Sequence, residues 1–260
     1  MSKFLSLENI YKAFNLKTVD ETVIFDDFCL EVKEGEFVSI VGSNGSGKTT
    51  LLNLISGSSM VDSGKIVLKD ENLNHVKESK RAKSIGRVFQ DPSLSTAPNL
   101  TVAENLALAD NKGKRYGLTF AVNKKKAQEY YDLLKPLNLG LEEKLNTKVK
   151  SLSGGQRQVL ALIMATMKPL DLLLLDEHTA ALDPKTSQVI MELTDKIVKE
   201  KKITTIMVTH NLRFAKDYGN RLLMFNEGQI VLDVSGEDKE KTKIEDLLKI
   251  FNEISIECGN

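Results

Sequence analysis

The chain has 260 residues, 41% of them hydrophobic and 28% charged, which is the composition of an ordinary soluble globular protein of one large domain or two small ones. Basic and acidic residues number 36 each, so no net charge attracts the chain to nucleic acid or to anionic lipid. Two cysteines far apart in sequence, Cys29 and Cys258, argue against a disulfide framework and suit a reducing compartment. The sequence predicts no signal peptide and no membrane-spanning run.

The first 90 residues carry several strand-like segments. Residues 28–32 alternate apolar and polar side chains, which predicts a half-buried strand. Residues 37–41 are apolar and β-branched, which predicts a buried strand. Two more short strands are expected at 65–68 and 84–90. Between them, residues 71–83 are polar and lysine-rich, and we expect a solvated helix or loop there.

The stretch after residues 37–41 fits the phosphate-binding pattern G-x-x-x-x-G-K-[ST]. It consists of Gly42, Ser43, Asn44, Gly45, Ser46, Gly47, Lys48 and Thr49, and Thr50 opens the helix that follows. Glycines let backbone N–H groups turn around phosphate oxygens, and the helix start adds unpaired N–H groups. Lys48 is placed to reach the β- and γ-phosphates and Thr49 to offer its hydroxyl to Mg²⁺. The sequence therefore predicts a site for ATP and Mg²⁺.

From residue 91 to about residue 167 the pattern is helical. Thr101 and Glu104 form a capping box in front of an apolar run. Residues 124–134 have helical spacing, with three lysines on a face that we expect to be solvated. Ser153 begins another helix.

Strands and helices alternate in the remainder, which indicates an α/β sheet. Strands are predicted at 172–176 and 203–209, with a helix between them that begins at Asp183 and the proline after it. A hairpin is predicted around residues 226–228. A second capping box, at Thr242 and Glu245, is expected to open a C-terminal helix.

The strand predicted for residues 172–176 ends in two carboxylates, Asp176 and Glu177. Ligands of α/β sheets gather at the carboxyl ends of strands, so both side chains should face the phosphate site. Asp176 can hold Mg²⁺, usually through water, beside Thr49. Glu177 can orient or deprotonate an attacking water.

Ser153, Gly154, Gly155 and Gln156 place a hydroxyl and two glycines at a helix start, which forms a second anion site. With Leu152 they spell Leu-Ser-Gly-Gly-Gln, the signature of the ATP-binding cassette (ABC) superfamily. From about residue 4 to residue 235 the chain resembles the nucleotide-binding subunit of an ABC transporter. The resemblance implies one ABC ATPase domain over residues 1–260, with an α/β P-loop NTPase fold. Its parts would be a RecA-like core with an antiparallel β subdomain (1–90 and 168–235), an inserted helical subdomain (91–167) and a C-terminal helix (236–260).

The resemblance also implies roles for single residues. Gln90 would touch Mg²⁺ and the attacking water, and His210 would contact the γ-phosphate. Phe14 would stack on adenine, with Tyr11 as the competing choice. Asp183 would cross the interface of a head-to-tail dimer.

The partners implied are a second copy of the chain, an integral membrane permease and, through the permease, an extracytoplasmic solute-binding protein. No nucleic acid is expected, and the chain would be peripheral at the cytoplasmic face of the membrane. The loop and helix after Gln90, roughly residues 91–108, are predicted to dock on the permease, with Leu94 and Leu106 as contacts.

His178 departs from the family pattern, in which proline or another small residue usually follows the glutamate. We interpret it as a tolerated variant; the alternative is a local perturbation of Glu177. Residues 176–184 also resemble ATPase subunits of a bacterial importer group that works with a lipoprotein-type receptor. Some of its members are thought to carry aromatic amino acids.

Other functions remain open at this point. The alternative to a transporter subunit is a soluble single-cassette ABC ATPase, such as an iron–sulfur cluster assembly ATPase. A catalytically dead scaffold is disfavoured because Lys48, Asp176, Glu177 and His210 are all present.

Overall fold

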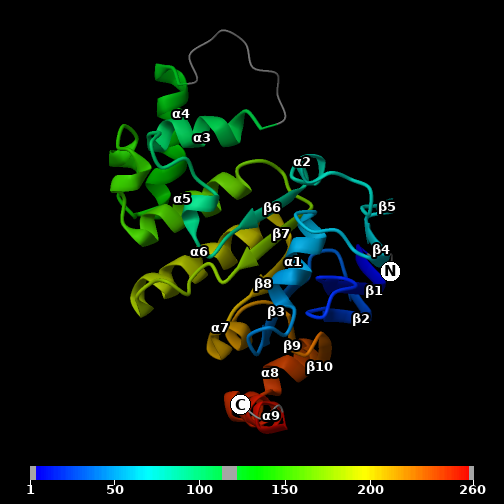
Figure 1. The fold of residues 1–260 in the computed structure, drawn as a ribbon. Coiled ribbons are helices and arrows are strands. Elements are labelled where there is room, and N and C mark those ends of the chain that lie inside the picture. Colours follow the sequence, from blue (N-terminus) through cyan, green and yellow to red (C-terminus); the bar gives the residue numbers. More distant parts are fainter. Residues whose placement is uncertain (1–3, 113–121, 258–260) are drawn as a thin grey trace.

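Two β-sheets organise the part of the chain that this computed structural model describes, residues 4–112 and 122–257 (Figure 1). The larger sheet has the strand order β10-β9-β3-β8-β7-β6; the strands from β9 to β6 run parallel and β10 is antiparallel to β9. Its strands are β3 (Phe37–Gly42), β6 (Ile85–Val88), β7 (Leu172–Asp176), β8 (Thr204–Val208), β9 (Arg221–Asn226) and β10 (Gln229–Ser235). Every residue of β3, β7 and β8 is buried, as their apolar runs predict.

The smaller sheet is antiparallel, with the order β2-β1-β4-β5. Its strands are β1 (Leu5–Phe14), β2 (Thr22–Val32), β4 (Ser63–Leu68) and β5 (Glu71–Asn72). Helix α1 (Lys48–Ser56) shares one apolar core with both sheets. In that core the ring of Phe28 lies with its centroid 4.6 Å from that of Phe25 and 5.6 Å from that of Phe225. The predicted α/β class with an antiparallel part is confirmed.

A helical segment follows β6 and is drawn mainly in green in Figure 1. Its helices are η1 (Pro92–Leu94), α3 (Val102–Asp110), α4 (Lys124–Leu134), η2 (Lys135–Leu137), η3 (Glu142–Lys144), η4 (Val149–Ser151) and α5 (Gly154–Thr166). The capping box predicted for α3 is confirmed, because Thr101 Oγ1 accepts from Glu104 N and Glu104 Oε2 accepts from Thr101 N. The buried residues of this segment share a second core with the other face of the larger sheet and with α6 (Pro184–Lys201). The residue boundaries of the subdomains stay a prediction.

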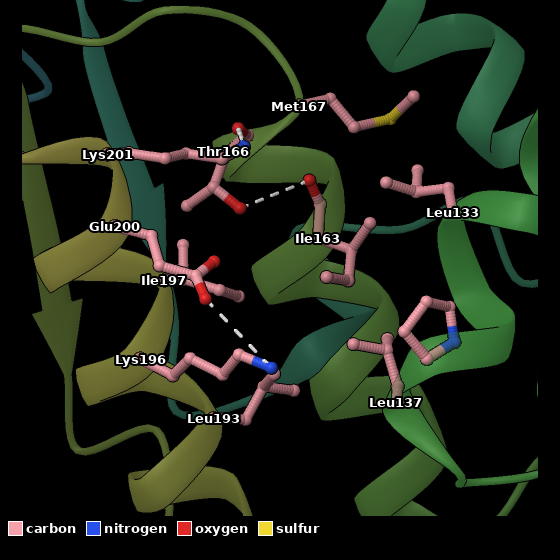
Figure 2. Close-up of a pocket in the computed structure, with 11 residues that line it drawn as sticks. Leu133, Leu137, Ile163, Thr166, Met167, Leu193, Lys196, Ile197, Glu200 and Lys201 are labelled. Carbon is pink, nitrogen blue, oxygen red and sulfur yellow. Dashed lines mark hydrogen bonds and ion pairs between the residues drawn. The ribbon is translucent and has the colours of Figure 1, made fainter.

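An apolar hollow of about 190 Å³ lies between α4, α5 and α6 (Figure 2). Leu133 lines it from α4, Ile163 from α5 and Ile197 from α6. Near one end, Lys201 Nζ donates to the carbonyl oxygen of Thr166 at 2.6 Å and so satisfies the last turn of α5. No residue predicted to bind nucleotide lines this hollow, so it is separate from the phosphate site.

The chain ends in α7 (Leu212–Asp217), α8 (Gly236–Lys241) and α9 (Ile244–Glu257). The capping box predicted at Thr242 is wrong. Thr242 Oγ1 donates to the carbonyl oxygen of Asp238 at 2.8 Å, and it is Lys243 N that donates to the first-turn carboxylate of Asp246. Among the described residues, no helix combines the length and the apolar character that a membrane crossing needs.

The polar residues 71–83 contain one buried cation, in the short helix α2 (Glu78–Arg81). Arg81 is 3% exposed and donates to the carbonyl oxygens of Leu54, Ile55 and Leu73 at 2.6 to 3.0 Å. It therefore caps the end of α1, where helix carbonyls lack partners. The expectation that this whole stretch is solvated is wrong at Arg81.

Candidate functional site

The phosphate loop joins the carboxyl end of β3 to the start of α1. Gly42, Gly45 and Gly47 all have positive φ, which glycine adopts without strain. A Cβ on Gly42 would lie 2.3 Å from the carbonyl oxygen of Phe225, and one on Gly47 would lie 2.8 Å from the Phe25 ring. Gly45 instead faces open space. Two glycines thus let the loop pack against β2 and β9, and the third leaves its outer rim clear.

Lys48 is folded back over this loop. Its Nζ donates to the carbonyl oxygens of Gly42 at 2.9 Å and Ser43 at 2.7 Å, and the residue is 5% exposed. Burial lowers the pKa of the Lys48 ammonium, and the negative charges of Glu177 and Asp176 oppose that shift. The cation therefore lies inside the loop that is predicted to hold the phosphates.

Asp176 ends β7 directly beside the start of α1. Its Oδ1 lies 3.4 Å from Thr49 Oγ1, so the predicted pair of magnesium-binding groups is brought together. No cluster of three or more His, Cys, Asp or Glu residues suited to a metal occurs among residues 4–112 and 122–257. A metal here would take most of its ligands from phosphate and water, which is how Mg²⁺ is usually held.

The second carboxylate oxygen of Asp176 is occupied by a residue that the sequence reasoning missed, Arg87 of β6. Arg87 Nη2 donates to Asp176 Oδ2 at 2.7 Å, and both side chains are 10% exposed. Its Nη1 donates to Asn53 Oδ1 of α1 at 2.7 Å, and its guanidinium carbon lies 4.4 Å from the centroid of the Phe89 ring. The available signal was an arginine inside an otherwise apolar strand.

Glu177 is brought into contact with His210, at the ends of β7 and β8. Glu177 Oε1 lies 2.6 Å from His210 Nε2. The backbone of Glu177 has φ 48°, a left-handed conformation that is uncommon for a side chain of this kind. Its N–H donates to the carbonyl oxygen of Val208 at 2.9 Å, so the turn that aims the carboxylate is fixed to β8. The glutamate is mostly buried while 44% of the histidine side chain is exposed.

His178, the departure from the family pattern, points away from solvent. It is 2% exposed, and its Nε2 lies 3.2 Å from Thr194 Oγ1 of α6. Because the Thr194 hydroxyl donates to the carbonyl oxygen of Ile190, the imidazole must donate to Thr194. Burial lowers the pKa of His178 to about 4. A neutral histidine that packs on α6 supports the interpretation of a tolerated variant.

The two aromatic candidates for adenine differ in exposure. Phe14 ends β1 and is 41% exposed, whereas Tyr11 is half-buried with its hydroxyl 3.5 Å from Glu21. Phe14 pairs in register with Thr22, close to the part of β2 that touches the phosphate loop. Of the two rings, Phe14 is therefore the one that is accessible to a nucleotide base near the phosphate loop.

The signature residues start α5. Ser153 Oγ accepts from Gln156 N at 3.2 Å, and Gln156 also contacts Lys144 at 3.0 Å. A Cβ on Gly155 would lie 2.5 Å from Thr186 Cγ2, so the glycine lets α5 start against the beginning of α6. Asp183 caps α6 at this place through Thr186 N. The signature residues therefore lie beside Asp183. The hydrogen bonds of Ser153 and Gln156 connect them to each other and to Lys144, and not to the phosphate loop.

Gln90 is exposed just after β6, at the edge of a cavity of about 370 Å³. Arg157 of α5 and His178 also line this cavity. Gln158 Nε2 donates to the carbonyl oxygen of Phe89 at 3.0 Å and so ties the signature helix to the residue before Gln90.

The prediction that Leu106 contacts the permease is wrong. Leu106 is fully buried in the core of the helical segment, so it cannot touch another protein. Helical spacing alone did not tell which side of α3 faces the core. Leu94 is 68% exposed and Leu108 is 42% exposed, so these two side chains are the accessible ones.

Comparison with known sequences finds a match over residues 25–180 to the family described as ABC transporter. A "Tyrosine transport ATP-binding protein" of Clostridioides difficile is 49% identical over 247 residues, which cover 95% of this chain and 98% of that protein. The "Methionine import ATP-binding protein MetN" of Clostridium tetani is 34% identical over 81% of this chain and 64% of its own length.

Solved structures agree. The dimeric post-hydrolysis state of the ATP-binding cassette MJ0796 bound to ADP and Pi has a TM-score of 0.76 at 30% identity, over 89% of this chain and 98% of the other. The ADP conformation of MJ1267, another ATP-binding cassette of an ABC transporter, has a TM-score of 0.79 at 25% identity and covers both chains completely.

Proposed function

Because this chain belongs to the ABC transporter family and is an ATP-hydrolysing, ATP-binding subunit of such a transporter, we propose that it powers uptake of a small solute, with an aromatic amino acid such as tyrosine as first candidate. The substrate class rests on the tyrosine transport ATP-binding protein of Clostridioides difficile, which is 49% identical to this chain over 247 residues. The resemblance of residues 176–184 to an importer group points the same way.

ATP would be held mainly by the phosphate loop. Its backbone N–H groups and the start of α1 would receive the phosphates, and Lys48 would turn from Gly42 and Ser43 to neutralise them. Phe14 would stack on the adenine. A hydroxyl oxygen from Thr49 and a carboxylate oxygen from Asp176, 3.4 Å apart, are the donors that Mg²⁺ prefers, so the residues fit this ion. Bound Mg²⁺ would supply positive charge against the β- and γ-phosphates.

The contact between Glu177 and His210 carries the hydrolytic part of the proposal. Its 2.6 Å distance fixes the carboxylate at the end of β7, next to Asp176. Glu177 would take a proton from the attacking water, and His210 would hold the carboxylate in place and contact the γ-phosphate. Gln90 would complete the site from the end of β6.

A second copy of the chain is proposed to complete each site. Ser153 and Gly155, at the start of α5 and packed beside α6, would form an anion site away from Lys48. In a head-to-tail dimer this site would cover the γ-phosphate held by the other copy, with Asp183 at the interface. Sizing the Glu177→Gln protein with and without ATP tests the dimer, which should form only with nucleotide. A monomer under saturating ATP would count against it.

The transport proposal is tested by uptake of labelled tyrosine in cells with the wild-type protein or the Glu177→Gln protein. Uptake should need the wild-type chain, which should co-purify with a multi-spanning permease. The alternative, a soluble cassette such as an iron–sulfur cluster assembly ATPase, predicts normal uptake in both strains and no membrane partner. A further expectation, a solute-binding protein that acts through the permease, would be tested by the same purification.

A further inference from the structure

We propose that Arg87 is a positioning residue that serves as the resident counter-cation of Asp176, so that the site accepts ATP before the metal arrives. The inference rests on the proposed nucleotide site and adds to it a residue outside the family motifs. Three observations carry it: the hydrogen bonds and ring contact of Arg87, the low exposure of its side chain (10%), and the different partners of the two Asp176 oxygens.

The two carboxylate oxygens of Asp176 have different partners. Oδ2 accepts from Arg87 Nη2 at 2.7 Å, and Oδ1 lies 3.4 Å from the hydroxyl of Thr49. With Oδ2 held, rotation of the carboxylate is prevented and Oδ1 stays directed at the start of α1. The arginine thus occupies only Oδ2, and Oδ1, which contacts Thr49, is the oxygen that faces the proposed metal position.

Arg87 is itself held rigidly. Its Nη1 donates to Asn53 Oδ1 at 2.7 Å and to Ser56 Oγ at 3.2 Å, near the C-terminal end of α1, where a cation is favourable. The guanidinium lies over the Phe89 ring, and Nε is buried without a hydrogen-bond partner. An arginine with a buried, unsatisfied N–H is costly, so its position is not explained by its own stability alone.

Charge gives the reason for this arrangement. Metal-free ATP carries several negative charges, and Asp176 is only 10% exposed in its side chain, so screening by water is weak. An uncompensated carboxylate beside Thr49 would repel the phosphates. With Arg87 at 2.7 Å the pair is neutral, and the repulsion that remains is small. Bound Mg²⁺ would supply positive charge beside Asp176, so the charge of Arg87 would then contribute less to ATP affinity.

The test is the ATP dissociation constant of Arg87→Met, measured by titration calorimetry in EDTA and in saturating Mg²⁺. We expect the constant to rise about tenfold in EDTA, equal to about 1.4 kcal/mol, and about threefold or less with Mg²⁺. The readout is the ratio of the two constants, which a general loss of structure would not change. Arg87→Lys retains the charge and should restore most of the affinity in EDTA.

Two controls separate charge compensation from structural support. In the Asp176→Asn background, Arg87→Met should no longer weaken metal-free binding, because the charge that needed a partner is gone. Arg221→Met removes another poorly exposed arginine, paired with Glu36 and Asp233, and should leave the ratio at the wild-type value.

Equal losses in EDTA and Mg²⁺, no loss at all, or a loss that persists with Asp176→Asn would each overturn the inference. None of these results would touch the proposed function, provided that the wild-type protein binds ATP more tightly with Mg²⁺. A wild-type protein that binds no ATP in either condition would refute both.

Discussion

Replacement of His178 by glutamine should make the protein less sensitive to acid. His178 is fully buried and its pKa is lowered from 6.5 to about 4. Well above pH 6.5 the imidazole is neutral in both the folded and the unfolded protein, so it does not change the free energy of unfolding. As the pH falls below 6.5, the unfolded chain binds a proton here that the folded chain refuses until about pH 4. Stability is therefore lost across that window.

The size of the effect follows from the two pKa values. At 1.36 kcal/mol per pKa unit, the complete loss below pH 4 is about 3.4 kcal/mol. Between pH 7.5 and pH 5.0 the same relation gives a loss of about 2 kcal/mol in the free energy of unfolding. Glutamine does not titrate, and its amide nitrogen can still donate to Thr194 Oγ1 as the imidazole does.

The assay is urea unfolding of the wild-type and His178→Gln proteins at both pH values. The wild-type protein should lose about 2 kcal/mol more free energy of unfolding than the variant. His75→Asn, which removes an exposed histidine, should keep the wild-type pH dependence. If His178→Gln loses as much stability as the wild-type protein, the imidazole is not held neutral and the reasoning fails.

Four further outcomes are expected. Lys48→Ala should abolish ATP binding or hydrolysis, because Lys48 is the cation inside the phosphate loop; near-normal turnover would contradict this. Glu177→Gln should retain ATP binding and slow hydrolysis by about 10²-fold or more, measured as phosphate release, and unchanged turnover would move the base elsewhere. Leu94→Asp should uncouple hydrolysis from uptake while the protein stays folded, whereas Leu106→Asp should unfold it, as circular dichroism would report. Arg81→Met should cost about 3 kcal/mol of unfolding free energy, since buried carbonyls lose their donor; a loss within error would contradict it.

Local patterns predicted the segments in which neighbouring residues determine the structure. The strand before the phosphate loop and the helix after it follow from glycine placement and apolar periodicity, and the structure agrees. The capping box at Thr101 is of the same kind.

The residues that were missed depend on partners far away in sequence. Arg87 is mostly covered because Asp176, 89 residues later, lies on the adjacent strand. Arg81 is buried because the end of α1 needs donors. Leu106 was misassigned because an apolar helix shows no contrast between its core side and its outer side.

The position of β3 also bears on synthesis of the chain at the ribosome. β3 lies between β8 and β9, whose residues follow it by more than 160 positions, and the N–H of Gly228 in the β9–β10 turn donates to the carbonyl oxygen of Ser46 in the phosphate loop. During translation, the phosphate loop therefore has neither neighbouring strand nor this support until most of the chain has emerged. Such long-range pairing is slow and exposes apolar strands in the meantime. We expect nascent chains stalled before residue 228 to retain no ATP, and a chaperone to cover β3 during that interval.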